Sequence, residues 1–234
     1  MEQQTSQDLV KTNTIYLVRH GENQANITKE FSYKKVDYPL TPKGVQQARQ
    51  TALYFRDEPI HEVYASPLKR ARETADIIAR EHHLPVTIME QFRELNLGEL
   101  EDMPPTAENW ALFGSVVKDW YNGRPETAFP GGENYHMALE RVQEGLQEIT
   151  HNKVGRNIVV VAHGGIVTVA VSGICQNLAD VVTIETFKVN HNCSITRMEL
   201  LSSAEKLSGT LTYWASHAHL SGEAALLVNA FPDK

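Results

Sequence analysis

The sequence has 234 residues, of which 41% are hydrophobic and 22% charged, an ordinary balance for a soluble globular protein. Its formal net charge of −7 does not suggest a basic surface, so nucleic acid is a poor candidate partner. No run approaches the roughly 18 apolar residues of a membrane span, and residues 1–13 lack the apolar stretch of a secretory signal. We therefore expect a cytoplasmic protein without a membrane partner.

Residues 14–19, TIYLVR, form an apolar run that predicts a strand. Residues 1–13 before it are polar and are expected to be a flexible tail, which leaves residues 14–234 as a single domain. A second run, NIVVVA at residues 157–162, is apolar throughout. Continuous apolar strands are typical of a sheet that is covered on both faces.

Helical patterns alternate with these strands along the chain. Residues 39–55 read as a turn followed by a helix, with Thr41 as the N-cap and Pro42 at the first helical position. The other expected helices span residues 66–84, 131–150 and 166–174, and further strands are expected within residues 61–68, 86–100, 192–200 and 209–216. The alternation predicts an α/β fold, a three-layer α/β/α sandwich with a mostly parallel sheet.

Residues 99–130 have no clear period but hold several aromatic residues. We expect them to be an inserted cap segment with a short helix, lying over the strand ends. Trp110 and Trp120, with Arg124 nearby, are candidates for a wall that contacts a bound molecule. The alternative is that the aromatic side chains only pack the segment onto the domain.

Both apolar strands run directly into a histidine and a glycine. The first ends in Arg19, His20 and Gly21, and the second in His163 and Gly164. In open α/β sheets ligands gather at the carboxyl ends of the strands. The two motifs therefore predict a site at this edge of the sheet.

Two further blocks complete a coherent set of groups for phosphoryl chemistry. Arg19 and Arg70 could clamp phosphoryl oxygens, since a guanidinium binds them in pairs. A neutral imidazole is a competent nucleophile, and neighbouring cations disfavour its protonation. Glu94 is the candidate that supplies a proton to the leaving alkoxide.

The sequence resembles the histidine phosphatase superfamily, which has the phosphoglycerate mutase-like fold. The resemblance covers roughly residues 14–220, in the order of the family's motifs. The matching stretches are LVRHGENQAN, DYPLTPKGVQQA, YASPLKRARETA, FRELNLGELE, FPGGENY and VVVAHGG. Six ordered blocks are far more specific than one Arg-His-Gly.

The resemblance implies a role for each site residue. His20 is the nucleophile that becomes phosphohistidine, and Glu94 is the proton donor that later activates water. The side chains implied to hold the phosphoryl group are Arg19, Arg70 and His163, and the residues expected to contact substrate are Asn26, Ser32 and Gly164. No metal and no cofactor are implied.

Three departures from the family pattern fall among the expected substrate contacts. Asn23 stands in place of a frequent Thr, and Ser32-Tyr33 in place of Gln-Gly. Leu100 and Asp102 alter the common Gly-Glu-Trp-Glu-Gly. The identity of the substrate therefore does not follow from the sequence.

The favoured function is a phosphomonoester hydrolase, a histidine acid-type phosphatase, acting on a small phosphorylated metabolite. A phosphoglycerate mutase is the main alternative, but the variant Glu-Arg-His-Tyr-Gly expected around the acid is absent. A non-catalytic phosphate-binding protein is the third alternative. His82-His83 and the HAH at residues 217–219 offer no metal-ligand spacing, which disfavours a metal-dependent hydrolase. A homodimer remains open, and Cys175 and Cys193 are expected to be buried thiols.

Overall fold

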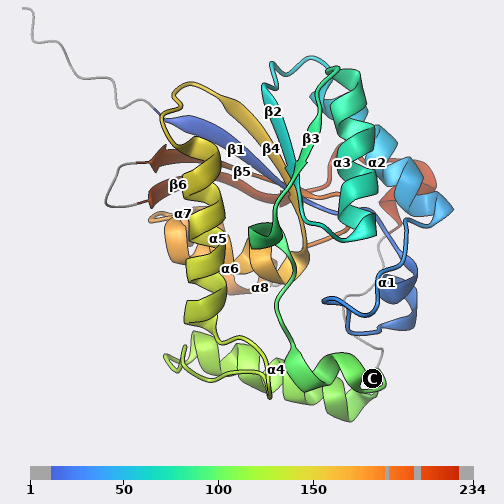
Figure 1. Ribbon diagram of the computed structural model, residues 1–234, viewed down its shortest axis with the longest axis vertical. Helices are drawn as coiled ribbons and strands as arrows, with labels where there is room; N and C mark the ends of the chain where they lie inside the picture. The colour runs from blue at the N-terminus through green and yellow to red at the C-terminus, as the bar shows by residue number, and fades with distance from the viewer. Residues whose placement is uncertain (1–11, 188–189, 203–206, 227–234) are drawn as a thin grey trace, which may run out of the picture.

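The computed structural model describes residues 12–187, 190–202 and 207–226. A six-stranded sheet with the order β3-β2-β4-β1-β5-β6 forms its centre (Figure 1). The strands are β1 (Asn13–Arg19), β2 (Glu62–Ala65), β3 (Val86–Ile88), β4 (Asn157–Ala162), β5 (Ile195–Ser202) and β6 (Leu207–Ser216). The first four strands pair in parallel, whereas β5 pairs antiparallel with both β1 and β6. The expected mostly parallel sheet is confirmed.

Helices connect the parallel strands, as the alternating pattern predicted. They are α1 (Gln24–Thr28), α2 (Pro42–Phe55), α3 (Lys69–Glu81), α4 (Ala107–Tyr121), α5 (Tyr135–Thr150), α6 (Gly164–Ile174), α7 (Leu178–Val181) and α8 (Ile184–Phe187). Three short 3₁₀ helices are η1 (Glu90–Phe92), η2 (Gly98–Asp102) and η3 (Gly222–Ala225). Thr41 caps α2 by accepting the N–H of Gly44 at 3.0 Å, and Pro42 is its first residue, as predicted.

The central strand β1 is buried on both faces, which makes the fold a three-layer sandwich. Ile15 and Leu17 belong to the apolar cluster that includes the buried side chains of α5 and α6. Tyr16 and Val18 face the opposite layer, formed by α2 and α3. Because successive side chains of a strand alternate between faces, a strand covered on both sides must be apolar throughout. This is the physical reason for the TIYLV and NIVVVA runs.

The cap segment consists of η2, α4 and the loop that leads to α5, and it lies at one end of the molecule (Figure 1). The helix of this segment is α4, which with fifteen residues is longer than the short helix expected. Trp120 packs inside this segment, with ring centroids 5.5 Å from Phe129 and 5.9 Å from Tyr135. Its Nε1–H donates to the carbonyl of Thr127 at 2.7 Å. Arg124 forms a surface ion pair with Asp119.

At the two chain ends, residues 1–11 of the expected tail and residues 227–234 lie outside the described residues. Asn13 is already the first residue of β1, and its Nδ2 donates to the carbonyl of Lys153 at 2.8 Å.

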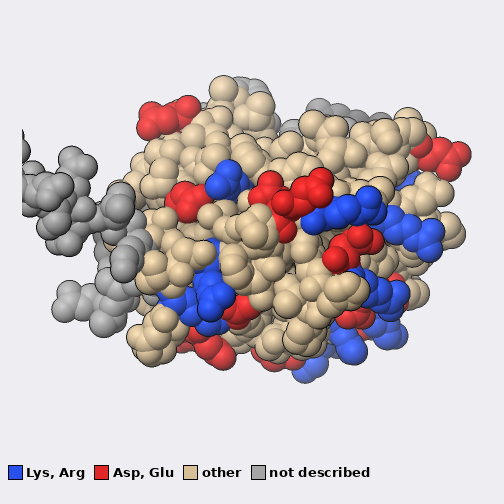
Figure 2. Space-filling view, turned by 90° about the horizontal axis from the view of Figure 1, so that it is seen from above, with Lys and Arg blue, Asp and Glu red and all other residues tan. Residues whose placement is uncertain are grey.

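Cys175 and Cys193 are free, buried thiols, as predicted. Across the described ranges, every helix is too short or too polar to cross a membrane. Basic and acidic side chains lie interspersed on the face shown in Figure 2.

The loop after β1 meets the first turn of α2 at backbone contact distance. A Cβ on Gly44 would lie 2.0 Å from the carbonyl oxygen of Glu22, and one on Gly21 would lie 2.6 Å from that of Gly44. Two further bonds fix the same contact: the Glu22 N–H donates to Gln47 Oε1 at 2.8 Å, and Thr41 Oγ1 donates to Glu22 Oε1 at 2.8 Å. The glycines therefore set the position of the loop that begins with His20.

Gly44→Ala should lower the free energy of unfolding by about 1–3 kcal/mol, because the new methyl group must displace backbone atoms. Gly114→Ala is the matched control, since a Cβ there meets no atom within 4 Å in the middle of α4. It should raise the free energy of unfolding by about 0.5–1 kcal/mol. Urea denaturation of the two variants measures both effects, and equal stabilities would contradict the close approach.

Candidate active site

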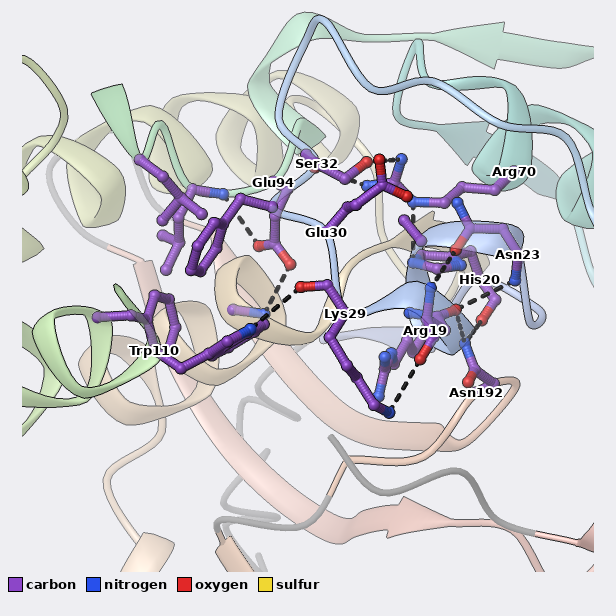
Figure 3. A pocket seen from close by; sticks show the side chains of 17 residues that line it. Arg19, His20, Asn23, Lys29, Glu30, Ser32, Arg70, Glu94, Trp110 and Asn192 are labelled. Atoms are coloured by element: carbon purple, nitrogen blue, oxygen red, sulfur yellow. Dashed lines mark hydrogen bonds between the residues drawn. The ribbon is translucent and has the colours of Figure 1, made fainter. Parts of the chain in front are cut away.

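A pocket lies at the carboxyl ends of β1 and β4, where the sequence placed the site (Figure 3). The predicted residues that line it are Arg19, His20, Asn26, Ser32, Arg70 and Glu94. His163 is fully buried beside it, with its ring centroid 5.1 Å from that of His20. Gly164 does not line the pocket, because it is the first residue of α6 and lies against Arg19, whereas Gly165 does line it.

The hydrogen bonds of His20 define which ring nitrogen is free to react. Nδ1 lies 2.7 Å from the carbonyl oxygen of Gly21, so it must carry the proton and donate. Nε2 accepts the Nε–H of Arg70 at 3.0 Å and therefore holds a lone pair. Burial, and then the charges of Arg70 and Arg19, hold the pKa of His20 well below its usual value. The side chain is a neutral imidazole with Nε2 available as a nucleophile.

Two arginine cations lie beside His20, Arg70 buried and Arg19 half-buried. Burial lowers the pKa of both, that of Arg70 to about 10, and the nearby Glu94 opposes the shift in each case. Arg70 donates from Nη1 and Nη2 to Ser32 Oγ and O at 2.8 and 3.0 Å. Arg19 donates from Nη1 to the carbonyl of Asn190, while its buried Nε has no hydrogen-bond partner among the described residues. A buried, unpaired guanidinium N–H is suited to an incoming anion.

His163 shows the same pattern of one occupied and one unpaired nitrogen. Its Nε2 lies 2.7 Å from Ser66 Oγ, and its buried Nδ1 lacks a partner within the described part of the chain. Burial, followed by the charge of Arg70, places the pKa of His163 well below its usual value. The ring is therefore neutral and can present one N–H to a ligand.

Glu94 occupies the N-terminus of α6. Its Oε1 accepts the N–H groups of Leu95 and Ile166, each at 2.9 Å, and its Oε2 accepts that of Gly165 at 3.1 Å. A Cβ on Gly165 would lie 2.7 Å from Oε1, so a glycine leaves room for the carboxylate. The N-terminus of α6 therefore holds the side chain that is expected to transfer the proton.

Asn192 is a site residue that the sequence did not single out. Its Nδ2 donates to the carbonyl of His20 and to Oδ1 of Asn26, each at 3.0 Å (Figure 3). Asn26 also accepts the N–H of Asn23, so it reaches the pocket as part of the cap of α1. The only sequence signal was that Asn192 shortly precedes an expected strand, and the pairing of β5 with β1 brings it to His20.

The outer wall of the pocket comes from the loop after α1 and from the cap segment. Trp110 lines the pocket, as one of the two readings predicted, and Phe113 lies beside it. The Trp110 ring packs at 4.7 Å from Phe31, and its Nε1–H donates to the carbonyl of Lys29 at 3.0 Å. Trp120 and Arg124 were wrong candidates for this wall, because neither lines the pocket.

The described residues contain no group of three or more His, Cys, Asp or Glu side chains that could hold a metal ion. The polar groups of the pocket are instead arginine and histidine nitrogens, which match the oxygens of an anion.

The chain is similar to proteins that are named as phosphatases and as phosphoglycerate mutases. It is 32% identical over 217 residues to a probable phosphoglycerate mutase GpmB of Escherichia coli O1:K1, covering 90% of this chain and 96% of that protein. It is 32% identical over 150 residues to an uncharacterized phosphatase PhoE of Bacillus subtilis strain 168, covering 64% and 71%. These names describe those two proteins.

Solved structures show the same fold. A phosphoserine phosphatase of Entamoeba histolytica, in complex with 3-phosphoglyceric acid, aligns with a TM-score of 0.70 and 25% identity over 89% of this chain and all 100% of that one. YhfR of Bacillus stearothermophilus aligns with a TM-score of 0.71 and 24% identity, covering 88% and 98%.

The sequence pattern of one family, described as the histidine phosphatase superfamily (branch 1), matches residues 15–209, most of the chain. The chain belongs to the histidine phosphatase superfamily.

Proposed function

We propose that the protein hydrolyses phosphomonoesters of a small metabolite through a phosphohistidine on His20. One observation carries this proposal: buried nitrogen donors without partners in the described chain, Arg19 Nε and His163 Nδ1, flank a histidine whose Nε2 lone pair is held ready. A tetrahedral anion needs several such donors around it, and the phosphorus must lie within reach of the nucleophile.

The phosphoryl group displaces the bond between Arg70 and His20 when it binds. Arg19 Nε–H, Arg70 Nε–H and His163 Nδ1–H then donate to its oxygens. For His163 this requires the tautomer in which Nε2 accepts the hydroxyl proton of Ser66. Attraction between the two guanidinium groups and a bound phosphate offsets the free energy that it costs to remove these cations from water.

Transfer proceeds in two balanced steps. The Nε2 lone pair of His20 forms a bond to phosphorus as the ester P–O bond breaks, and the carboxyl proton of Glu94 goes to the leaving alkoxide. Glu94 then takes a proton from water, the water oxygen bonds to phosphorus, and the P–N bond breaks. Inorganic phosphate leaves, and His20 regains its lone pair.

The substrate's organic part lies against Phe31, Trp110 and Phe113, which form the apolar outer side of the pocket. Lys29 and Glu30 also line the pocket, so the site offers both signs of charge to polar groups on the substrate. Phosphoglycerate mutase activity is a second candidate, because a relative that aligns over most of the chain carries that name.

The wild-type protein should release inorganic phosphate from both alkyl and aryl phosphomonoesters in the presence of EDTA. Glu94→Gln should lower kcat/KM on an alkyl phosphate about 100-fold or more, and lower it less on p-nitrophenyl phosphate. The physical reason is that an alkoxide needs a proton to leave, whereas a nitrophenolate leaves without one. Phosphate release over a matched panel of esters measures this difference.

Equal losses on the two ester classes would show that Glu94 is not the general acid. Activity lost in EDTA and restored by Mg²⁺ would contradict charge neutralisation by Arg19, Arg70 and His163. Conversion of 3-phosphoglycerate into its 2-phosphate isomer, without net phosphate release, would favour the mutase.

Trp110→Ala should raise KM and change the ranking of substrates, since its ring lines the pocket. Trp120→Ala should keep the ranking and lower the free energy of unfolding by about 3–5 kcal/mol, because it packs between Phe129 and Tyr135. Steady-state kinetics and urea denaturation of both variants give the comparison. The reverse pattern would place substrate recognition elsewhere than on this face of α4.

A further inference from the structure

A carboxylate from the cap segment holds the loop that carries Ser32. One oxygen of Glu101, in η2, accepts three consecutive backbone N–H groups, from Tyr33 at 2.8 Å, from Lys34 and from Lys35 at 2.7 Å. Residues 31–39 form neither helix nor strand, so no regular backbone pairing supports this loop. Hydrogen bonds from amides to a carboxylate are roughly twice as strong as neutral ones, and three of them converge here.

The residue next to these amides orients the guanidinium of Arg70. Ser32 accepts Nη1–H with its Oγ and Nη2–H with its carbonyl oxygen, and its own hydroxyl donates to the carbonyl of Val36 at 2.5 Å. Both Nη groups of Arg70 are therefore directed at one residue. Since the guanidinium is planar, fixing these two nitrogens also fixes the direction of Nε–H.

That direction is toward the nucleophile. Arg70 Nε–H donates to His20 Nε2, so the edge of the guanidinium that faces the site is set from behind by Ser32 (Figure 3). Glu101 is thus connected to His20 in three steps. Its carboxylate binds the amide of Tyr33, the neighbouring Ser32 binds Arg70, and Arg70 binds His20.

We propose that Glu101 is a positioning residue, which fixes the orientation of Arg70 through the Ser32 loop. The consequence for substrate rests on the proposed function, whereas the orientation of Arg70 does not. Without Glu101, the three amide N–H groups donate to water instead, and Ser32 loses its fixed position. Arg70 is then ordered only when phosphate binds, which costs free energy of binding. The loss therefore appears mainly as weaker phosphate binding, because Arg70 already contacts the phosphoryl group in the ground state.

Other contacts to the same loop define what Glu101 adds. Arg93 Nη1 donates to the carbonyl of Tyr33 at 3.3 Å, and Asp37 accepts the N–H of Lys69 at 2.8 Å. The first bond holds the carbonyl of Tyr33, whose N–H goes to Glu101, and the second holds the loop at Asp37. The amides of residues 33–35, directly after Ser32, are held by Glu101.

Asp102 offers a matched control from the adjacent position, because it does not line the pocket, contrary to the expectation that it contacts substrate. It forms an ion pair with Lys35, so it joins the same two segments, but both side chains of the pair are more than half exposed. An exposed ion pair contributes little, since water and salt screen it. Asp102→Ala removes an acidic side chain and a contact between the segments while leaving the three amide bonds intact.

The first measurement uses the ligand-free protein. In ¹⁵N NMR spectra, the Arg70 Nε–H signal, identified by its loss in Arg70→Lys, should exchange with water faster in Glu101→Ala than in the wild type. The amides of residues 33–35 should lose protection from hydrogen exchange at the same time. Asp102→Ala should leave both signals unchanged. An unaltered Arg70 signal in Glu101→Ala, with these amides deprotected, would overturn the proposal.

The second measurement is titration with inorganic phosphate, followed by kinetics on an alkyl phosphate. Glu101→Ala should raise the Kd for phosphate and the KM about tenfold and change kcat less, whereas Asp102→Ala should match the wild type. Ser32→Ala should weaken phosphate binding too. Glu101→Ala should raise the Kd for phosphate by a smaller factor in the Ser32→Ala background than in the wild type, because both substitutions act through one path. Fully additive losses would overturn the path through Ser32. If the wild type binds phosphate but hydrolyses no ester, the proposed function fails, while a weaker Kd in Glu101→Ala still supports positioning.

Discussion

The hydrogen bond from Arg70 Nε to His20 Nε2 is the interaction on which the site depends. It shows that the imidazole keeps its lone pair, and it places a buried cation against that lone pair. A buried arginine and a half-buried one near a neutral imidazole are costly, and burial lowers the pKa of both. Such an arrangement persists only where the surrounding fold fixes it.

The rest of the structure supplies that fixation from several independent elements. β1 and β4 place His20 and His163 at neighbouring strand ends, and α2 holds the loop after β1 at backbone contact through Gly44. The N-terminus of α6 holds Glu94. The cap segment reaches the same centre from outside, through Trp110 on the pocket wall and through η2 on the Ser32 loop. In the proposed function, chemistry and substrate recognition are thus carried by different parts of the chain that meet at one pocket.

The sequence predicted the parts of the site whose residues follow local patterns. Strand ends placed Arg19 and His20, and capping chemistry placed Thr41 and the start of α2, because these depend on neighbours in the chain. Contacts that depend on strand order could not be predicted in this way. Asn192 reaches His20 only because β5 lies beside β1 in the antiparallel direction. The aromatic residues of the cap illustrate the same limit, since a segment without a clear period did not separate the pocket-lining Trp110 from the packed Trp120.

The most direct test of the mechanism is to trap the covalent intermediate. Rapid mixing with a ³²P-labelled phosphomonoester, followed by an alkaline quench and peptide mapping, should place the label on the peptide that contains His20. The label should be stable in alkali and lost in acid, as expected of a phosphorus–nitrogen bond, and it should be absent from His20→Ala, which should not turn over. Label on a serine or cysteine peptide, or undiminished turnover by His20→Ala, would contradict a nucleophilic His20.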